Sequence, residues 1–124
     1  MATVGPMLEA LATATTCRIT TVGRRTGEPH VVTVWFALDG STLYAPSRHG
    51  LEGDWLRNVE ATPAVEVGAG RGRATVAGRG RVAVAREDVD RGVAALVAKY
   101  RRSGTFVAGW VDDPPTMVAI ELPS

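Results

Sequence analysis

The sequence predicts an antiparallel α+β barrel of about six strands with two or three short helices. Along its 124 residues, short runs rich in β-branched or other apolar residues recur between turn-forming Gly, Asp and Pro. Helical periodicity occurs in only two of the connections between these runs, whereas a parallel sheet needs a crossover at nearly every step. The length suits a single domain spanning residues 1–124.

The N-terminal segment predicts a short helix followed by the first strand. Met7, Leu8 and Leu11 are spaced as on one face of a helix over residues 6–12, and a proline suits the first turn. We expect this helix to close one end of the domain. β-Branched residues dominate residues 15–22, which indicates a strand.

The next strand is expected to be covered on both faces. Residues 30–38 are apolar at nearly every position rather than at every second one. This pattern predicts the core on one side of the strand and a second copy of the chain on the other. Asp39-Gly40 is a strong hairpin-turn signal, and residues 41–46 follow as the paired strand.

A second helix is predicted over residues 54–61, with Asp54 as its N-terminal cap. Trp55 lies on the apolar face of this helix and is expected to pack mainly in the core. Asn58 lies beside that face, where a polar side chain needs a partner. A hydrogen bond to the neighbouring loop would supply that partner.

The segment that follows is rich in Gly and Arg. Residues 64–67 predict a strand, and residues 70–77 are then nearly duplicated in residues 78–85. Arginine and threonine alternate with alanine and valine in this repeat, which predicts a strand with one polar face and with Val84 on its apolar side. A nucleic-acid-binding segment is the alternative interpretation, although the net charge of only +1 argues against a protein that coats nucleic acid.

The C-terminal third predicts one long helix and a final strand. Acidic residues open the helix at residue 87, an apolar stripe that includes Val93 and Leu96 follows, and Gly104 ends it. Residues 117–122 predict the last strand.

Several kinds of site and location are excluded by composition. A lone Cys17 leaves no disulfide or multi-cysteine metal site within one chain, and His30 and His49 have no acid or cysteine at ligand spacing. No apolar run approaches the ~20 residues of a membrane span, and the N-terminus does not have the pattern of a signal peptide. We therefore expect a cytoplasmic protein without a metal. No nucleophile or phosphate-loop motif identifies a catalytic residue.

Two loops concentrate the residues that bind anions. Residues 23–27 contain Arg24, Arg25 and Thr26, and residues 47–50 read Ser47-Arg48-His49-Gly50. Guanidinium groups, hydroxyl groups and accessible backbone amides are the donors that recognise phosphate. The composition of the two loops therefore suits a phosphate site, and the alternative interpretation is that the two adjacent arginines are solvated surface charge.

The order and spacing of these motifs resemble a known family. Residues 23–30, Trp35-Phe36, residues 47–50 and residues 54–58 together resemble the deazaflavin-dependent nitroreductases. This group belongs to the flavin and deazaflavin oxidoreductases, whose split β-barrel is the FMN-binding fold of pyridoxamine 5′-phosphate oxidase. The resemblance covers residues 15–68 best.

The resemblance implies a homodimer that binds coenzyme F420, with FMN as the alternative, and passes hydride between F420 and a small organic acceptor. It implies that the two loops hold the cofactor phosphate and that the strand over residues 32–36 lies along the ring. A carrier that binds the cofactor without turnover is a further alternative, and Tyr100, Phe106 and Trp110 are candidates for the substrate pocket. The predicted cofactor-binding residues are Arg24, Arg25, Thr26, Val34, Trp35, Ser47, Arg48, His49, Gly50, Trp55 and Asn58.

Overall fold

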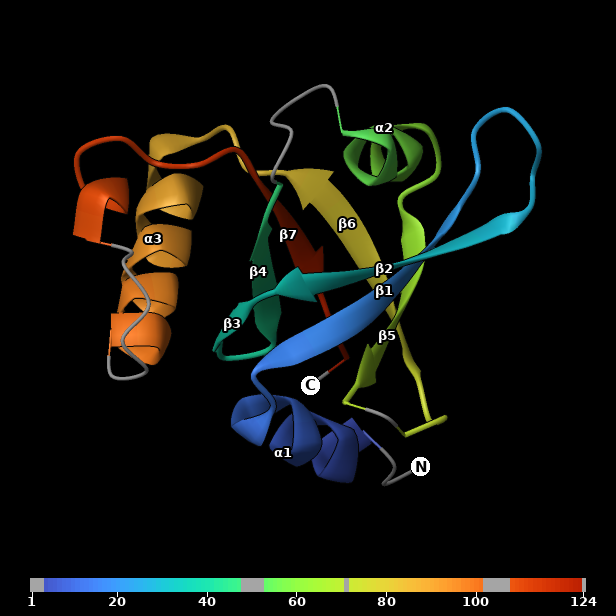
Figure 1. The fold of residues 1–124 in the computed structure, drawn as a ribbon, viewed down its shortest axis with the longest axis horizontal. Helices are drawn as coiled ribbons and strands as arrows, with labels where there is room; N and C mark the ends of the chain where they lie inside the picture. The colour runs from blue at the N-terminus through green and yellow to red at the C-terminus, as the bar shows by residue number, and fades with distance from the viewer. Residues whose placement is uncertain (1–3, 48–52, 71, 102–107, 124) are drawn as a thin grey trace.

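The computed structural model describes residues 4–47, 53–70, 72–101 and 108–123. Within these ranges one antiparallel sheet curls around a core in the order β2-β1-β5-β6-β7-β4-β3, as in half of a split barrel (Figure 1). The strands are β1 (Thr16–Val22), β2 (Pro29–Trp35), β3 (Ala37–Asp39), β4 (Thr42–Pro46), β5 (Ala64–Ala69), β6 (Val76–Val82) and β7 (Met117–Glu121). The helices are α1 (Val4–Thr13), α2 (Asp54–Ala61), α3 (Arg86–Tyr100) and the 3-10 turn η3 (Ala108–Trp110).

The predicted α+β class is confirmed, but the sheet of the described residues has seven strands rather than six. The difference lies at Phe36, which divides the single predicted strand of residues 30–38 into β2 and β3. The Tyr100 hydroxyl accepts a hydrogen bond from the Phe36 N–H at 2.8 Å, so this amide is satisfied outside the sheet ladder. β2 and β3 therefore continue one another in the chain yet form opposite edges of the curled sheet.

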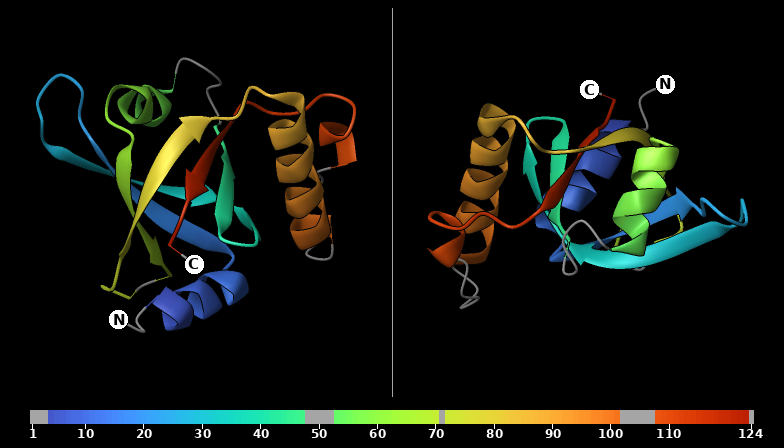
Figure 2. Two further views of the ribbon diagram at one scale, coloured as in Figure 1. Left: turned by 180° about the vertical axis from the view of Figure 1, so that it is seen from behind. Right: turned by 90° about the horizontal axis from the view of Figure 1, so that it is seen from above.

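The interior of the curled sheet is apolar and closed at one end by a helix. Ile19, Leu43, Val67 and Ile120 are completely buried there. Leu11 of α1 is also completely buried in this cluster, which confirms that the N-terminal helix closes an end of the sheet (Figure 2). Helix α2 lies at the opposite end, near the β1–β2 loop (Figures 1 and 2).

Helix α3 packs on the outside of the sheet through a second apolar cluster. Its predicted stripe is confirmed, because Val93 and Leu96 are buried against β4 and β7. Gly92 permits this close approach, since a Cβ there would lie 2.8 Å from the Tyr44 ring. The predicted end of the helix at Gly104 lies outside the described residues.

The Gly-Arg repeat forms one strand, β6, which runs from the last two residues of the first copy through Val82 of the second. β6 begins at Val76, so Arg73 and Thr75 precede it. Arg79 and Arg81 are exposed on its polar face as predicted, but Val84 lies beyond the strand and is 80% exposed. The prediction that Val84 lies on the buried side is therefore wrong.

In the single chain only one face of β2, the first part of residues 30–38, is covered. β2 is an edge strand, and on its outer face Val31 is 62% and Trp35 41% exposed. On the inner face Val34 is buried. Covering of the outer face by a second copy stays a prediction.

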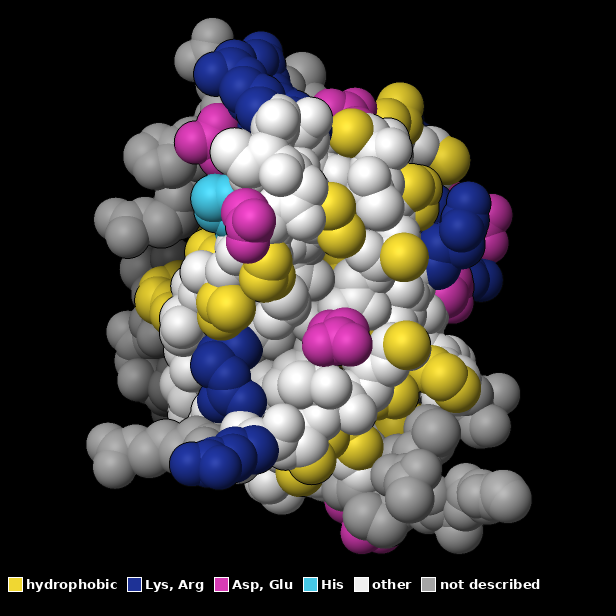
Figure 3. All heavy atoms as spheres, turned by 90° about the vertical axis from the view of Figure 1, so that its right-hand side faces the viewer, with side chains coloured by type: hydrophobic (Ala, Val, Ile, Leu, Met, Phe, Trp, Pro, Cys, Tyr) yellow, Lys and Arg dark blue, Asp and Glu magenta, His cyan; other side chains and the backbone are white. Residues whose placement is uncertain are grey.

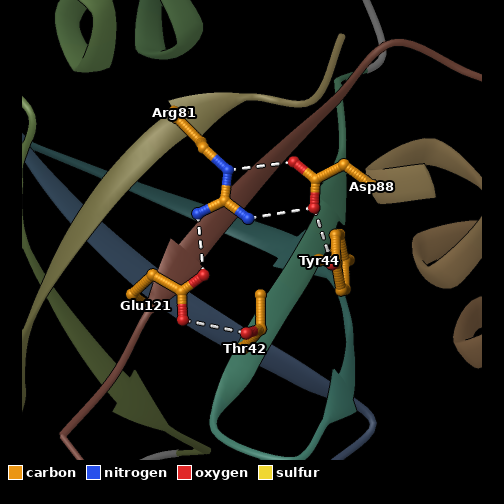
Figure 4. Close-up of polar contacts among 5 residues, drawn as sticks. All are labelled: Thr42, Tyr44, Arg81, Asp88 and Glu121. Carbon is orange, nitrogen blue, oxygen red and sulfur yellow. Dashed lines mark hydrogen bonds and ion pairs between the residues drawn. The ribbon is translucent and has the colours of Figure 1, made fainter. Parts of the chain in front are cut away.

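A polar network ties α3 to the sheet (Figure 4). Arg81 of β6 makes a forked pair with Asp88, with both N···O distances at 2.9 Å. A third Arg81 nitrogen contacts Glu121 of β7 at 2.7 Å, and the Tyr44 hydroxyl donates to Asp88 at 2.8 Å. Hydrogen bonding to Arg81 lowers the pKa of both Asp88 and Glu121.

This network predicts loss of stability in acid. The pKa of Asp88 is lower in the folded protein than in the unfolded chain. Asp88 therefore adds its full share to the free energy of unfolding when the pH is above the unfolded-state pKa, and this share is lost as the pH falls through the folded-state pKa. Asp88→Asn is expected to lower the free energy of unfolding at pH 7 by about 1 kcal/mol, since Arg81 is partly exposed and solvent screens the pair. The change should shrink toward pH 3 in urea titrations.

Asp90→Asn is the matched control for this prediction. Asp90 also lies in α3 and pairs with Arg86 at 3.8 Å, but both side chains are well exposed. Its substitution should change the free energy of unfolding by no more than a few tenths of a kcal/mol. Equal effects of the two substitutions at pH 7 would contradict the role assigned to the network.

Candidate cofactor site

The β1–β2 loop is held in one conformation by its own backbone. The Gly23 N–H donates to the Glu28 carbonyl and the Gly27 N–H to the Gly23 carbonyl, both at 2.8 Å. Gly27 has a φ of 74°, a left-handed conformation that favours glycine. The Thr26 hydroxyl oxygen accepts from the Glu28 N–H at 3.1 Å. The Thr26 hydroxyl proton remains able to donate to a ligand.

Asn58 of α2 anchors this loop to the body of the protein. Its side chain is only 3% exposed, and its Oδ1 accepts from the Arg24 backbone N–H at 3.1 Å and from Arg24 Nη1 at 3.0 Å. Its Nδ2 donates to the Thr21 hydroxyl at 3.2 Å. Asn58 therefore has the partner that a polar side chain beside an apolar helix face needs, and the β1–β2 loop supplies it.

Asp54 does not cap α2, so that prediction is wrong. The N-cap is Gly53, and no side chain makes a capping hydrogen bond there. The Asp54 carboxylate instead lies 3.2 Å from Arg24 Nη2, and Asp54 is the first residue of the helix. This position still suits an acid, because the carboxylate lies near the positive end of the helix dipole.

The two loop arginines have different surroundings. Arg24 is held by Asn58 and Asp54, and its side chain is only 21% exposed. Arg25 is exposed and makes no hydrogen bond or ion pair with another described residue. Arg24 therefore shapes the loop, and the Arg25 guanidinium is the one that can turn its full fork toward an anion.

The second predicted loop is described only at its first residue. Ser47 follows β4, is 7% exposed, and its N–H donates to the Thr116 carbonyl at 2.8 Å. Arg48, His49 and Gly50 lie outside the described residues. Trp55 is partly buried and packs against the core of the curled sheet, as predicted for a packing residue.

Aromatic side chains gather at the far end of β2. The Trp35 indole stacks on Tyr100 with ring centroids 5.2 Å apart and planes inclined by 25°. Trp110 lies 6.4 Å from Trp35 in a tilted arrangement. Two of the three candidates for the substrate pocket therefore meet at Trp35, while Phe106 lies outside the described residues. The Val34 side chain is in the core, so only its backbone can face a ligand.

The loop and the aromatic cluster lie at opposite ends of β2. The strand runs from Pro29, beside the loop, to Trp35. Seven residues of extended chain span about 20 Å. An elongated ligand with an anionic group at one end and a flat ring at the other has the shape that this strand can support.

Lys99 is a residue that the sequence did not single out. Its ammonium lies 3.4 Å from the centroid of the Phe36 ring, on the side of α3 that faces the sheet. Burial lowers the pKa of Lys99 to about 8 and raises the pKa of the neighbouring Cys17 thiol to about 12. In the sequence Lys99 is an ordinary basic residue near a helix end, so no pattern marks it.

The burial of Lys99 is expected to lower the free energy of unfolding by an amount that depends on pH. Because the folded pKa of about 8 lies below the ordinary value of 10.5, the unfolded chain binds more protons between these values. Stability attributable to Lys99 therefore rises with pH across that window. At pH 7, Lys99→Met is expected to increase the free energy of unfolding by on the order of 1 kcal/mol after solvent screening.

In urea titrations, the free energy of unfolding of Lys99→Met should exceed that of the unmodified protein by less at pH 10 than at pH 8. Comparing two proteins removes the part of the Cys17 titration, opposite in direction above pH 9, that does not depend on the Lys99 charge. Lys99→Arg is the control. Its guanidinium group stays charged, so this variant should remain less stable than Lys99→Met at pH 10. An advantage of Lys99→Met that is constant over this range would contradict the prediction.

Within the described ranges, no helix is long and apolar enough to cross a membrane. Nor do the residues that the structure describes contain a group of three or more His, Cys, Asp or Glu able to hold a metal ion.

Comparison with known proteins gives a family and several similar folds. The family profile for pyridoxamine 5′-phosphate oxidase matches residues 6–121. No protein with a curated description matches at a significant level. The solved structures below are all under 25% identical to the chain, so they show likeness of fold alone.

A candidate 5-nitroimidazole antibiotic resistance protein of Bacteroides thetaiotaomicron superposes with a TM-score of 0.77 at 14% identity, over 100% of this chain and 82% of that one. An FAD-binding protein of Mesorhizobium loti superposes with a TM-score of 0.68 at 19% identity, over 98% of this chain and 91% of that one. An F420 reductase superposes with a TM-score of 0.63 at 22% identity, over 94% of this chain and 91% of that one.

Proposed function

Because the chain belongs to the pyridoxamine 5′-phosphate oxidase family, a group of flavin- and deazaflavin-binding split barrels, we propose that it is an oxidoreductase that binds coenzyme F420 and transfers hydride to or from a small organic acceptor. The observation that carries the proposal is the anchored β1–β2 loop. Asn58 fixes its backbone while Arg25 stays without a described partner. The resemblance of the loop motifs favours F420, and FMN is the alternative.

The residues present suit such a cofactor. Arg25, the Thr26 hydroxyl and Ser47 would hold its phosphate, and Arg24 would add positive charge from its fixed position. Trp35 and the outer backbone of β2 would lie along the ring. The cofactor, when bound, supplies hydride chemistry, and the protein contributes position and exclusion of water. Arg48, His49 and Gly50 follow Ser47 in the sequence, and they and Asn58 are further candidates for holding the phosphate.

Fluorescence titration of the purified protein with F420 and with FMN tests this proposal. We expect saturable quenching by F420 in the micromolar range and weaker binding of FMN. Arg25→Gln should weaken F420 binding by roughly tenfold to a hundredfold, because a charge-assisted hydrogen bond contributes about 1.5–3 kcal/mol. Arg79→Gln removes an exposed arginine of β6 and should have no effect. Absence of quenching by either cofactor at tens of micromolar would refute the proposal.

Turnover distinguishes an enzyme from a carrier. The candidate residues that the structure describes act mainly through charge and backbone, an arrangement that would also serve a carrier of the cofactor. We expect reduced F420 bound to the protein to be oxidised by an added acceptor under anaerobic conditions, faster than F420 in buffer. Binding without acceleration would assign the protein to the carrier class instead.

We extend the proposal to a homodimer that covers the outer face of β2. Val22, Val31 and Trp35 are all exposed large apolar side chains from β1 and β2. Hydrophobic groups are visible on the side of the molecule drawn in Figure 3. Light scattering at micromolar concentration should give twice the mass of the 13.1 kDa chain. A monomeric mass would contradict this assembly.

A further inference from the structure

A separate cavity lies at the other end of β1 from the anchored loop. It is an open cleft with a volume of about 760 Å³. It is lined by Thr16 and Arg18 of β1, Thr33 of β2, and Gly70, Gly72, Arg73 and Thr75 between β5 and β6. Since β1 spans seven residues, this cavity is about 20 Å from the Gly23 end of the strand. Figure 3 shows basic side chains toward the lower edge of this side of the molecule.

Arg18 is held in place across the outer surface of the sheet. It is paired with Thr33 of β2 on one side and with Gly68 of β5 on the other. A Cβ at position 68 would lie 2.6 Å from Arg18 Nη2, so glycine leaves the room that the guanidinium occupies. Nη2 donates to the Gly72 carbonyl. A guanidinium has five N–H donors, so most of them remain available to a ligand.

The cavity has positive charge that no described acid balances. Its lining includes Arg73 as well as Arg18, and no Asp or Glu among the described lining residues. Neither arginine forms an ion pair with a carboxylate in the described part of the chain, whereas Arg24 and Arg81 do. Cys17 also lines the cavity, but burial raises the pKa of its thiol to about 12, so it adds no negative charge at neutral pH.

Hydroxyl groups complete the set of donors. Thr16, Thr33 and Thr75 contribute to the lining, and their hydroxyls make no hydrogen bond with any other residue that the structure describes. Two guanidinium groups with three hydroxyls match the oxygen atoms of a carboxylate or phosphate.

We propose that this cavity binds a small organic molecule through an oxyanion group, carboxylate or phosphate, held between Arg18 and Arg73. The threonine hydroxyls donate to the same group or to polar atoms beside it. Gly68 and the Gly72 carbonyl orient Arg18 for this contact. The site shares no residue with the anchored loop, and Thr33, on the outer face of β2 between Val31 and Trp35, is its only described lining residue on β2.

Side-chain NMR of the arginine Nε–H groups in cofactor-free protein tests the inference. Inorganic phosphate and succinate are titrated separately, with sodium chloride at equal ionic strength as the control for screening. We expect saturable shifts of the Arg18 and Arg73 signals at millimolar concentration with at least one of the two anions. Saturable shifts with phosphate alone, with succinate alone or with both would show which class of oxyanion binds. Each of these three results supports the site.

Substitutions separate the site from general attraction of anions. Arg18→Gln and Arg73→Gln should each weaken the binding at least tenfold, and the matched Arg79→Gln should not change it. Gly68→Ala keeps both charges but displaces the Arg18 guanidinium, so it should weaken binding as well. Arg73 is exposed, so its substitution is not expected to impair folding. No saturable shift, or binding that survives both arginine substitutions, would overturn the inference.

Cofactor titration of Arg18→Gln keeps this inference distinct from the proposed function. We expect F420 or FMN to bind this variant as tightly as the unmodified protein. Loss of phosphate and succinate binding with cofactor binding intact supports a separate site. A parallel loss of both would make the cavity part of the cofactor site and overturn the inference. Failure of cofactor binding in the unmodified protein would refute only the proposed function.

Discussion

Replacing Asn58 with alanine is expected to lower the free energy of unfolding by about 2 kcal/mol and to weaken cofactor binding at least tenfold. Asn58 is buried and satisfies the Arg24 backbone N–H and the Thr21 hydroxyl at the same time. Truncation leaves these buried polar groups without their partner, which costs about 1–3 kcal/mol. It also releases the β1–β2 loop from α2, so ordering the loop would oppose binding of a phosphate.

Urea unfolding and fluorescence titration with F420 measure the two effects separately. Arg57→Ala is the matched control, because Arg57 is the preceding residue of α2 but is exposed. Asn58→Asp keeps an oxygen acceptor for Arg24 while losing the donor to Thr21, so it should retain more cofactor binding than Asn58→Ala. If Asn58→Ala binds F420 as tightly as the unmodified protein, the loop does not need its anchor and the site geometry proposed here is wrong.

The need of Asn58 for a partner could be predicted from local signals, because a polar residue beside the apolar face of an eight-residue helix must be satisfied. Its partner, Arg24, lies in a loop 34 residues earlier and is adjacent only in the fold. The helix bounds of α2 and the Asp39-Gly40 hairpin also follow from local signals, the hairpin being confirmed by the pairing of Asp39 with Thr42 and a Gly40 φ of 62°.

Asp54 shows where local reasoning fails. An acid at the start of a helix is usually explained by capping, but the tertiary contact with Arg24 takes its carboxylate instead. Arg18 was not singled out for a similar reason. Its environment depends on Gly68 and Gly72, which are about fifty residues away in the sequence and adjacent only in the folded sheet. No periodicity in the sequence reports such a contact.

The break between β2 and β3 at Phe36 also depends on a contact between residues distant in the sequence, the hydrogen bond from the Phe36 N–H to the Tyr100 hydroxyl. Tyr100→Phe is expected to lower the free energy of unfolding by about 2 kcal/mol. The Tyr100 hydroxyl accepts from the Phe36 N–H, and its oxygen also lies 2.7 Å from the Thr15 carbonyl oxygen and 2.9 Å from the Phe36 carbonyl oxygen. One hydroxyl therefore joins the junction of β2 and β3 to the start of β1.

Phenylalanine keeps the ring that stacks on Trp35, so the substitution isolates the hydroxyl. Tyr44→Phe is the matched control: it removes a hydroxyl that donates to Asp88, but Asp88 keeps its forked pair with Arg81. Its cost should therefore be smaller than that of Tyr100→Phe in urea titrations. Hydrogen exchange of the Phe36 amide should also accelerate in Tyr100→Phe alone, because only this substitution removes its acceptor. Equal costs with unchanged exchange would mean that the sheet, and not Tyr100, sets the break at Phe36.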